Sequence, residues 1–111
     1  MEVARKAVEV ASDKQASNIV LLDVRGLCSF TDFFVICTGD SQRQARTIYD
    51  EIQESLKRED ITPHHREGTL DSGWLLLDYG DVVVHIFGTG ERDYYKLDEL
   101  WHGAGPVLRI Q

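Results

Sequence analysis

Two apolar, β-prone runs that flank Gly80-Asp81 constrain the fold more than any other part of this chain. Glycine tolerates the positive φ that a type II′ turn requires at its first position, so the pair predicts a two-residue β-hairpin. Such a turn also fixes the register. Tyr79 faces Val82, and the pairing continues outward until Trp74 faces Phe87. The sequence therefore predicts which side chains share each surface of the hairpin.

The two surfaces of this hairpin differ in chemistry, because successive side chains of a strand point to opposite faces. One surface is almost purely apolar and carries Leu75, Leu77, Tyr79, Val82, Val84 and Ile86. The other mixes aromatic, charged and aliphatic residues, namely Trp74, Leu76, Asp78, Val83, His85 and Phe87. This mixed surface is typical of a binding site. It is equally typical of a half-exposed sheet face with a cross-strand Asp78/His85 pair.

The length of 111 residues predicts a single domain, residues 1–111, and the content of 42% hydrophobic and 28% charged residues is that of a soluble globular protein. No apolar run approaches the roughly 18 residues that a membrane span needs. The acidic start of the chain is untypical of a signal or transit peptide. Two cysteines, Cys28 and Cys37, are too few for a secreted disulfide framework. We therefore expect a cytoplasmic protein with no membrane attachment.

The net charge of −7, from 12 basic and 19 acidic residues, bears on the kind of partner. A protein that binds nucleic acid through phosphates needs a basic face, so we expect little or no direct nucleic-acid binding. An acidic domain suits a basic protein partner, because complementary potentials speed encounter and fix orientation. The same charge also serves plain solubility, and composition alone does not separate the two explanations.

The rest of the chain predicts helices and strands in alternation. Helices are expected over residues 2–14, 41–59 and 92–101, and strands over 19–24, 33–38, 64–69 and the hairpin. Leu27 and Phe30 are expected to tuck under the sheet, Glu67-Gly68 to form a turn, and residues 107–110 to pack on the body as a tail. The order α-β-β-α-β-β-β-α indicates the α/β class, with a single mixed sheet flanked by helices.

The strand, Gly39-Asp40-Ser41 and helix in succession resemble the element of nucleotidyltransferases in which a helix N-terminus receives phosphate. Such enzymes also need carboxylates, usually spaced Asp-x-Asp, that converge on a metal ion. No such pair follows, and Asp78 and Asp81 straddle a turn. We therefore interpret Ser41 as the cap of a helix, in a capping box with Gln44, and predict that the protein is not an enzyme.

The histidines and cysteines do not form a metal-binding pattern. His64 and His65 are adjacent, so on a strand they point to opposite faces. His85, His102 and the two cysteines lie on other predicted elements, without the paired spacing of a zinc site. We expect no metal and no cofactor, and the residues favour binding over catalysis.

Between Asp23 and Trp101 the chain resembles the ribosomal silencing factor family, also called the Iojap or RsfS family. The residues that carry the resemblance are Asp23-Val24, Thr31-Asp32-Phe33-Phe34-Val35-Ile36, Thr38-Gly39, Ser41, Glu67-Gly68, Trp74, Asp78-Tyr79-Gly80-Asp81, Val83-Val84-His85, Phe87, Arg92, Tyr94-Tyr95, Leu97-Asp98 and Leu100-Trp101. One departure is Asp98, where the family more often has glutamate, and the charge is kept.

The resemblance implies a fold similar to that of nucleotidyltransferases but without the catalytic acids. It also implies binding to the large ribosomal subunit through its basic ribosomal protein fourteen, which blocks joining of the small subunit and represses translation. The partner-binding residues that it implies are Trp74, Asp78, His85, Phe87, Arg92, Tyr95 and Glu67. Trp74 and Phe87 would be apolar anchors, Asp78 would meet a basic side chain, and His85 would donate to the partner or orient Asp78.

Two other hypotheses stay open at the level of sequence. A degenerate transferase fold can hold a nucleotide in a groove near Ser41 and act as a ligand sensor. Alternatively, an exposed aromatic face that binds a partner can also pair with itself, which would make the free protein a homodimer.

Overall fold

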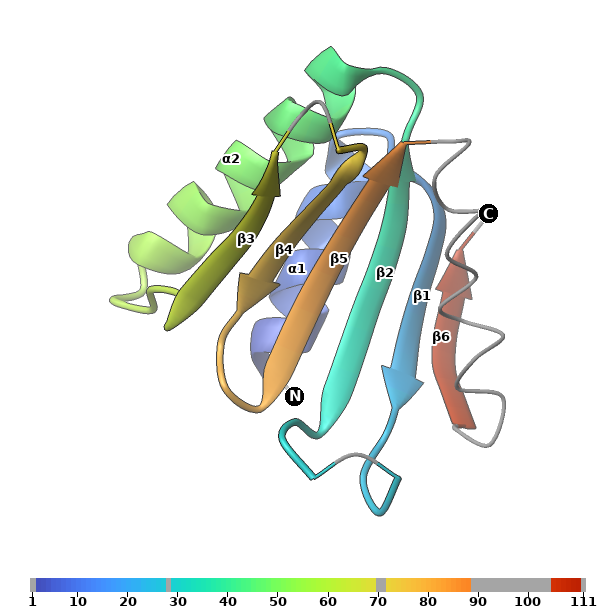
Figure 1. The fold of residues 1–111 in the computed structure, drawn as a ribbon, viewed down its shortest axis with the longest axis vertical. Coiled ribbons are helices and arrows are strands. Elements are labelled where there is room, and N and C mark those ends of the chain that lie inside the picture. The colour runs from blue at the N-terminus through green and yellow to red at the C-terminus, as the bar shows by residue number, and fades with distance from the viewer. Residues whose placement is uncertain (1, 28, 70–71, 89–104, 111) are drawn as a thin grey trace.

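The computed structural model describes residues 2–27, 29–69, 72–88 and 105–110, the last segment by its backbone. Its elements are α1 (Glu2–Asp13), β1 (Ser17–Asp23), β2 (Phe33–Gly39), α2 (Gln42–Lys57), β3 (His65–Thr69), β4 (Trp74–Asp78), β5 (Val82–Gly88) and β6 (Gly105–Ile110). The strands form one six-stranded sheet in the order β3-β4-β5-β2-β1-β6 (Figure 1). β2 and β5 pair in parallel and the other neighbours are antiparallel, which confirms the predicted α/β class with a mixed sheet.

The β4–β5 hairpin has the register that its turn predicts. Trp74 pairs with Phe87, and each step inward follows the same sequence until Asp78 pairs with Val83. The amide of Tyr79 donates to the carbonyl of Val82 over 2.8 Å and closes the turn. Gly80 has φ +91°, the left-handed conformation for which glycine was expected at this position.

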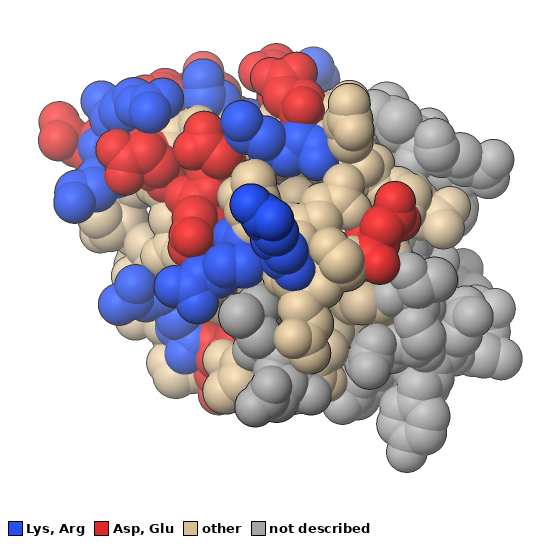
Figure 2. All heavy atoms as spheres, turned by 90° about the horizontal axis from the view of Figure 1, so that it is seen from above, with Lys and Arg blue, Asp and Glu red and all other residues tan. Residues whose placement is uncertain are grey.

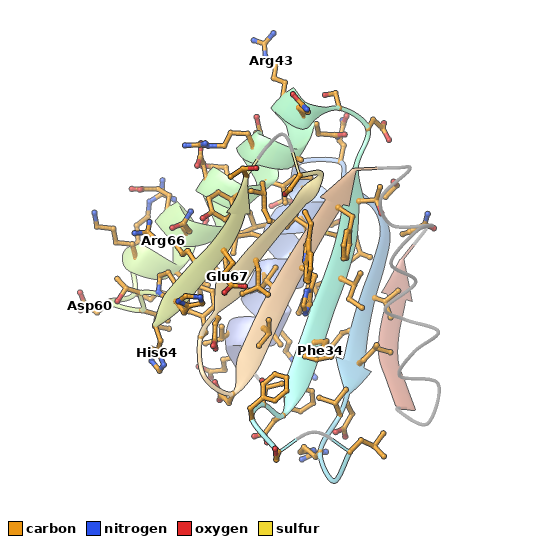
Figure 3. The ribbon with its side chains drawn as sticks, in the orientation of Figure 1. Phe34, Arg43, Asp60, His64, Arg66 and Glu67 are labelled. Atoms are coloured by element: carbon orange, nitrogen blue, oxygen red, sulfur yellow. The ribbon has the colours of Figure 1, made fainter. Side chains whose placement is uncertain are left out.

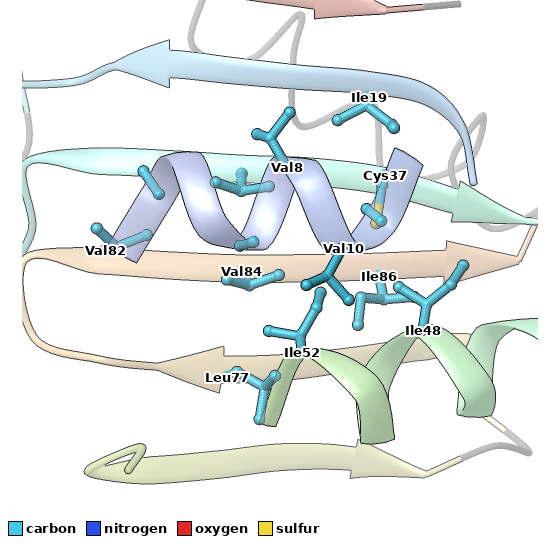
Figure 4. Close-up of a cluster of buried hydrophobic side chains, with 14 of the residues drawn as sticks. Val8, Val10, Ile19, Cys37, Ile48, Ile52, Leu77, Val82, Val84 and Ile86 are labelled. Carbon is cyan, nitrogen blue, oxygen red and sulfur yellow. The ribbon is translucent and has the colours of Figure 1, made fainter. Parts of the chain in front are cut away.

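Both described helices cover the same face of the sheet (Figure 1). Their apolar residues recur at helical spacing, so each helix turns one stripe toward the strands. Val8 and Val10 of α1 and Ile48 and Ile52 of α2 are buried in the core between the helices and the strands (Figure 4). The apolar surface of the hairpin lies in this core, with all six of its residues buried, namely Leu75, Leu77, Tyr79, Val82, Val84 and Ile86.

The start of α2 is capped by Ser41, as predicted. The Ser41 Oγ accepts a hydrogen bond from the Gln44 amide over 3.0 Å. The second half of the predicted capping box differs, because Gln44 Oε1 accepts from the amide of Asp40 rather than from that of Ser41. Gln44 Nε2 donates to the carbonyls of Lys14 and Gln15, over 3.2 Å and 3.0 Å. One side chain therefore joins the start of α2 to the segment that follows α1.

The β1–β2 loop differs from the prediction. Leu27 and Phe30 were expected under the sheet, but 50% of Leu27 and 66% of Phe30 are exposed. The neighbouring strands β1 and β2 already have buried side chains on both of their faces, among them Leu21, Leu22, Phe34 and Val35. The loop extends past the end of the strands, so its apolar residues have no sheet surface to cover (Figure 1).

The predicted Glu67-Gly68 turn is also wrong. Both residues lie within β3, where Glu67 pairs with Leu76 and Gly68 with Leu75. Gly68 has φ +93°, and a Cβ at this position would lie 1.9 Å from the carbonyl oxygen of Trp74. The glycine is therefore required by the close approach of two strands rather than by a change of chain direction.

The ends of the chain agree with the prediction where they are described. Residues 105–110 form β6, which pairs with β1 in antiparallel and so packs on the body of the protein. The helix expected over residues 92–101 lies outside the described residues. No helix in the described part of the chain is long and apolar enough to cross a membrane.

Candidate functional site

The face of the sheet opposite α1 and α2 carries the mixed surface of the hairpin, and we call it the aromatic face. Figure 3 shows this face toward the viewer, with Glu67 on β3 and Phe34 on β2. Paired residues of neighbouring strands share a face, so the register defines its members. They are His65, Glu67 and Thr69 of β3, Trp74, Leu76 and Asp78 of β4, Val83, His85 and Phe87 of β5, Phe34, Ile36 and Thr38 of β2, and Val20 and Leu22 of β1.

Four rings meet at the centre of the aromatic face. The Trp74 ring stacks on Phe87, with a centroid separation of 5.6 Å and an interplanar angle of 18°, and lies 5.8 Å from His85. Phe34 meets His85 edge to face at 5.0 Å. Trp74 Nε1 donates a hydrogen bond to His85 Nδ1 over 3.2 Å. The indole is therefore held in one orientation by stacking and by a directional bond.

His85 is a buried and neutral histidine. Only 5% of the residue is exposed, and desolvation lowers its pKa to about 4. Because Nδ1 accepts the proton of Trp74, the proton of the neutral ring is on Nε2. Nε2 has no hydrogen-bond partner among the described residues.

The hypothesis of an Asp78/His85 pair finds no hydrogen bond in the structure. Asp78 Oδ1 instead accepts from the Gly80 amide over 2.8 Å and so supports the hairpin turn. His85 lies opposite Leu76, with Trp74 and Asp78 as its two diagonal neighbours across the strands. The ring of His85 interacts with Trp74, on the diagonal away from the turn.

Burial decreases across the aromatic face from β5 to β3. Val83, His85 and Phe87 on β5 are at most 5% exposed, whereas Trp74, Leu76 and Asp78 on β4 are half-buried. All residues of β3 are exposed. The more exposed part of the aromatic face is therefore the β4 and β3 side, which carries Trp74, Leu76, Asp78 and Glu67.

The structure thus brings together three of the seven partner-binding residues implied by the resemblance, namely Trp74, His85 and Phe87. Asp78 and Glu67 lie on the same face beside them, and Glu67 Oε1 is 2.9 Å from His65 Nε2. Arg92 and Tyr95 lie outside the described residues. Leu76 and Phe34 were not singled out as partner-binding residues. For Leu76, the hairpin register already placed it beside Trp74 and Asp78.

Potential catalytic and ligand sites do not assemble in the parts of the chain that are described. No three side chains among His, Cys, Asp and Glu come together there in a way that could hold a metal ion. Ser41 is engaged as a helix cap. Two hollows of about 430 and 540 Å³ lie between α2 and β3 and share Asp50, Gln53 and Arg66, but Ser41 lines neither of them.

Charges on the helix side are mixed in sign. In Figure 2 basic and acidic side chains lie next to each other across the view from above. Arg46 pairs with Asp50, and Lys14 with Glu51, so several basic groups are already opposed by carboxylates. This distribution differs from the single-sign basic surface with which proteins follow a phosphate backbone.

The fold and the aromatic face together define a small α/β domain with stacked rings on the sheet face that the helices leave uncovered. The family described as "ribosomal silencing factor during starvation" matches residues 1–111. The ribosomal silencing factor RsfS of Bacillus subtilis is 38% identical over 108 residues, which cover 97% of this chain and 91% of that protein. The RsfS of Halalkalibacterium halodurans is 37% identical over 110 residues, with 99% and 93% covered.

A solved structure agrees with these sequence relatives. The crystal structure of a protein from Chromobacterium violaceum superposes with a TM-score of 0.87 at 34% identity, over 99% of this chain and 92% of the other. This chain belongs to the ribosomal silencing factor family.

Proposed function

We propose that this protein is a cytoplasmic repressor of translation that binds the large ribosomal subunit at its basic ribosomal protein fourteen and sterically blocks joining of the small subunit. Membership of the silencing factor family supports the ribosome as the target. The observation that carries the proposal is the arrangement of the aromatic face, where a fixed, half-buried Trp74 shares one face of the sheet with the carboxylates of Asp78 and Glu67.

Trp74 is suited to be the principal anchor of the interface. Tryptophan is enriched among residues that dominate binding energy, and rigid groups lose little conformational freedom when a partner covers them. Here the indole is already fixed by Phe87 and His85 before any partner arrives. We assign His85 and Phe87 to the support of Trp74 rather than to direct contact, because both are buried.

Asp78 and Glu67 would supply charge complementarity to a basic partner. Both carboxylates lie on the aromatic face and neither forms an ion pair with a described Lys or Arg within 4.0 Å. Partly exposed charges act over about 10 Å at 0.1 M salt, so they would steer the approach and set the orientation of the partner. Binding should accordingly weaken as salt is raised.

Steric exclusion requires occupancy and no chemistry. The molecule measures 35 × 34 × 23 Å, whereas a stable interface buries about 800 Å² on each partner. A body of this size on the face that receives the small subunit would stand well above the joining surface. This mechanism is consistent with a family of regulators and needs neither a metal nor a cofactor.

The test is a sucrose gradient of purified subunits mixed at a Mg²⁺ concentration that favours joining, with the protein added before or after mixing. Added first, the protein should leave two separate subunit peaks and migrate with the large subunit. Trp74→Ala should weaken binding about thirtyfold, because truncation of a central tryptophan commonly costs about 2 kcal/mol. Trp74→Phe is the matched variant. It keeps an aromatic ring stacked on Phe87, so its affinity for the large subunit should fall less than that of Trp74→Ala.

Thermal unfolding of each variant serves as the folding control, because Trp74 also supports the hairpin. Migration with the small subunit would contradict the proposed target. Whole ribosomes that form while the protein stays bound would contradict the steric mechanism. A folded Trp74→Ala variant with unchanged affinity would contradict the assignment of the aromatic face.

A further inference from the structure

A second apolar feature lies at the end of the sheet, in the loop between β1 and β2. Leu27 and Phe30 are 50% and 66% exposed, and they are the large hydrophobic residues that stand out as exposed in the described part of the chain. A single exposed hydrophobic residue needs no explanation. Two such residues within four positions place exposed apolar area on one loop.

The loop is held by its backbone on both sides. The Val24 amide donates to the Asp32 carbonyl, and the Leu27 amide donates to the Val24 carbonyl. The amides of Asp32 and Phe33 both donate to the carbonyl of Asp81 over 3.0 Å, which ties the loop to the β4–β5 turn. The two exposed side chains are therefore presented from a braced loop at the same end of the sheet as Asp81 (Figure 1).

The loop is continuous with the aromatic face through a row of rings. Phe30 lies 6.4 Å from Phe34, Phe34 lies 5.0 Å from His85, and His85 lies 5.8 Å from Trp74. Phe34 is placed on β2 between the loop and the centre of the face (Figure 3). The three centroid distances add up to about 17 Å, so the rings of Phe30 and Trp74 are at most this far apart. A standard interface of about 800 Å² is roughly 30 Å across, so one interface can cover both rings.

Carboxylates lie at the loop end of this row of rings and along the hairpin that carries Trp74. Asp32 and Asp81 are exposed at the loop end, and Asp78 lies between them and Trp74 along the hairpin. The basic residue nearest in sequence, Arg25, is engaged by Asp23 through two hydrogen bonds of 2.9 Å and 2.6 Å. The loop therefore offers apolar area within an acidic surrounding, which suits a basic partner rather than a second copy of this acidic chain.

We infer that Leu27 and Phe30 form a second apolar anchor of the interface whose first anchor is Trp74, so that one basic protein partner covers both. This inference rests on the proposed function, since it extends the same interface to the end of the sheet. The partner must then present two apolar contacts about 17 Å apart or less, with basic groups beside them.

The test compares the double variant Leu27→Ser/Phe30→Ser with wild type for affinity to purified large subunits, by co-sedimentation over a range of protein concentrations. Because both side chains are exposed, the melting temperature should stay within a few degrees of wild type. The affinity should fall at least tenfold. Thr47→Ala, which changes an exposed residue of α2 on the opposite side of the sheet, is the control and should bind as wild type.

The outcomes separate this inference from the proposed function. If wild type binds and Trp74→Ala weakens binding while the loop variant binds normally, only the second anchor is wrong. If wild type does not bind large subunits at all, the proposed function itself fails. Light scattering adds a further outcome: a wild-type dimer that the loop variant converts to a monomer would assign the loop to self-association and overturn the inference.

Discussion

Replacing His85 by glutamine tests whether the buried imidazole makes this fold sensitive to mild acid. Burial lowers the pKa of His85 to about 4 in the folded protein, from an ordinary value near 6.5. Well above pH 6.5 the ring is neutral in both the folded and the unfolded state, so its titration does not change the free energy of unfolding. As the pH falls from 6.5 toward 4, the unfolded chain takes up a proton that the folded protein does not, so stability is lost over this range.

The magnitude follows from the size of the pKa difference. A shift of one unit corresponds to about 1.4 kcal/mol, so His85 should remove roughly 2 to 3 kcal/mol of stability between pH 7.5 and pH 4.5. In a domain of this length that loss corresponds to a decrease in melting temperature on the order of 10 °C. Glutamine can still accept the Trp74 proton but does not titrate.

The assay is urea unfolding of wild type, His85→Gln and His64→Gln at the two pH values. Other groups also titrate, so the informative quantity is the difference between variants. Wild type and His64→Gln, whose side chain is exposed, should lose the same amount of stability, and His85→Gln should lose roughly 2 to 3 kcal/mol less. Equal acid sensitivity in all three proteins would refute the argument that a buried, neutral His85 controls this response.

Three further predictions concern the backbone, the charge and the chemistry. Gly68→Ala should destabilise the protein by about 2 kcal/mol or more in urea unfolding, while Gly26→Ala, equally left-handed but with open space around a new Cβ, should cost less. Asp78→Asn keeps an acceptor for the Gly80 amide and should weaken large-subunit binding at low salt, and Asp78→Lys should weaken it further. Affinities equal to that of wild type at all salt concentrations would contradict the charge argument. ATP, GTP or (p)ppGpp with Mg²⁺ should neither raise the melting temperature nor be hydrolysed, and a shift or turnover that depended on Ser41 or Asp78 would favour a ligand sensor or an enzyme.

The sequence predicted the features of the fold that depend on local rules. The turn at Gly80-Asp81 gave the register of β4 and β5, because a two-residue loop leaves only one pairing. Helical periodicity predicted the helix that the structure shows as α2, and the Ser41 cap was visible from its spacing to Gln44. These predictions required no knowledge of distant contacts.

The features that were missed depend on how distant segments approach each other. Gly68 was interpreted as a turn residue, although its glycine is needed because the Trp74 carbonyl lies where a side chain would be. His85 has two diagonal neighbours of comparable sequence spacing, and it interacts with Trp74 rather than Asp78. Sheets twist, so diagonals differ in distance, and an alternating pattern carries no information about that difference.

The position of β5 between β4 and β2 has a consequence for the growing chain. The residues of β1, β2, β3 and β4 are all synthesised before residues 82–88, yet the β1–β2 and β3–β4 pairs are not neighbours in the sheet. Insertion of β5 joins the two halves through one antiparallel and one parallel ladder. The same strand brings His85 and Phe87, which fix the indole of Trp74. The union of the β3–β4 and β2–β1 pairs and the fixed position of the Trp74 indole therefore both depend on the same strand, β5.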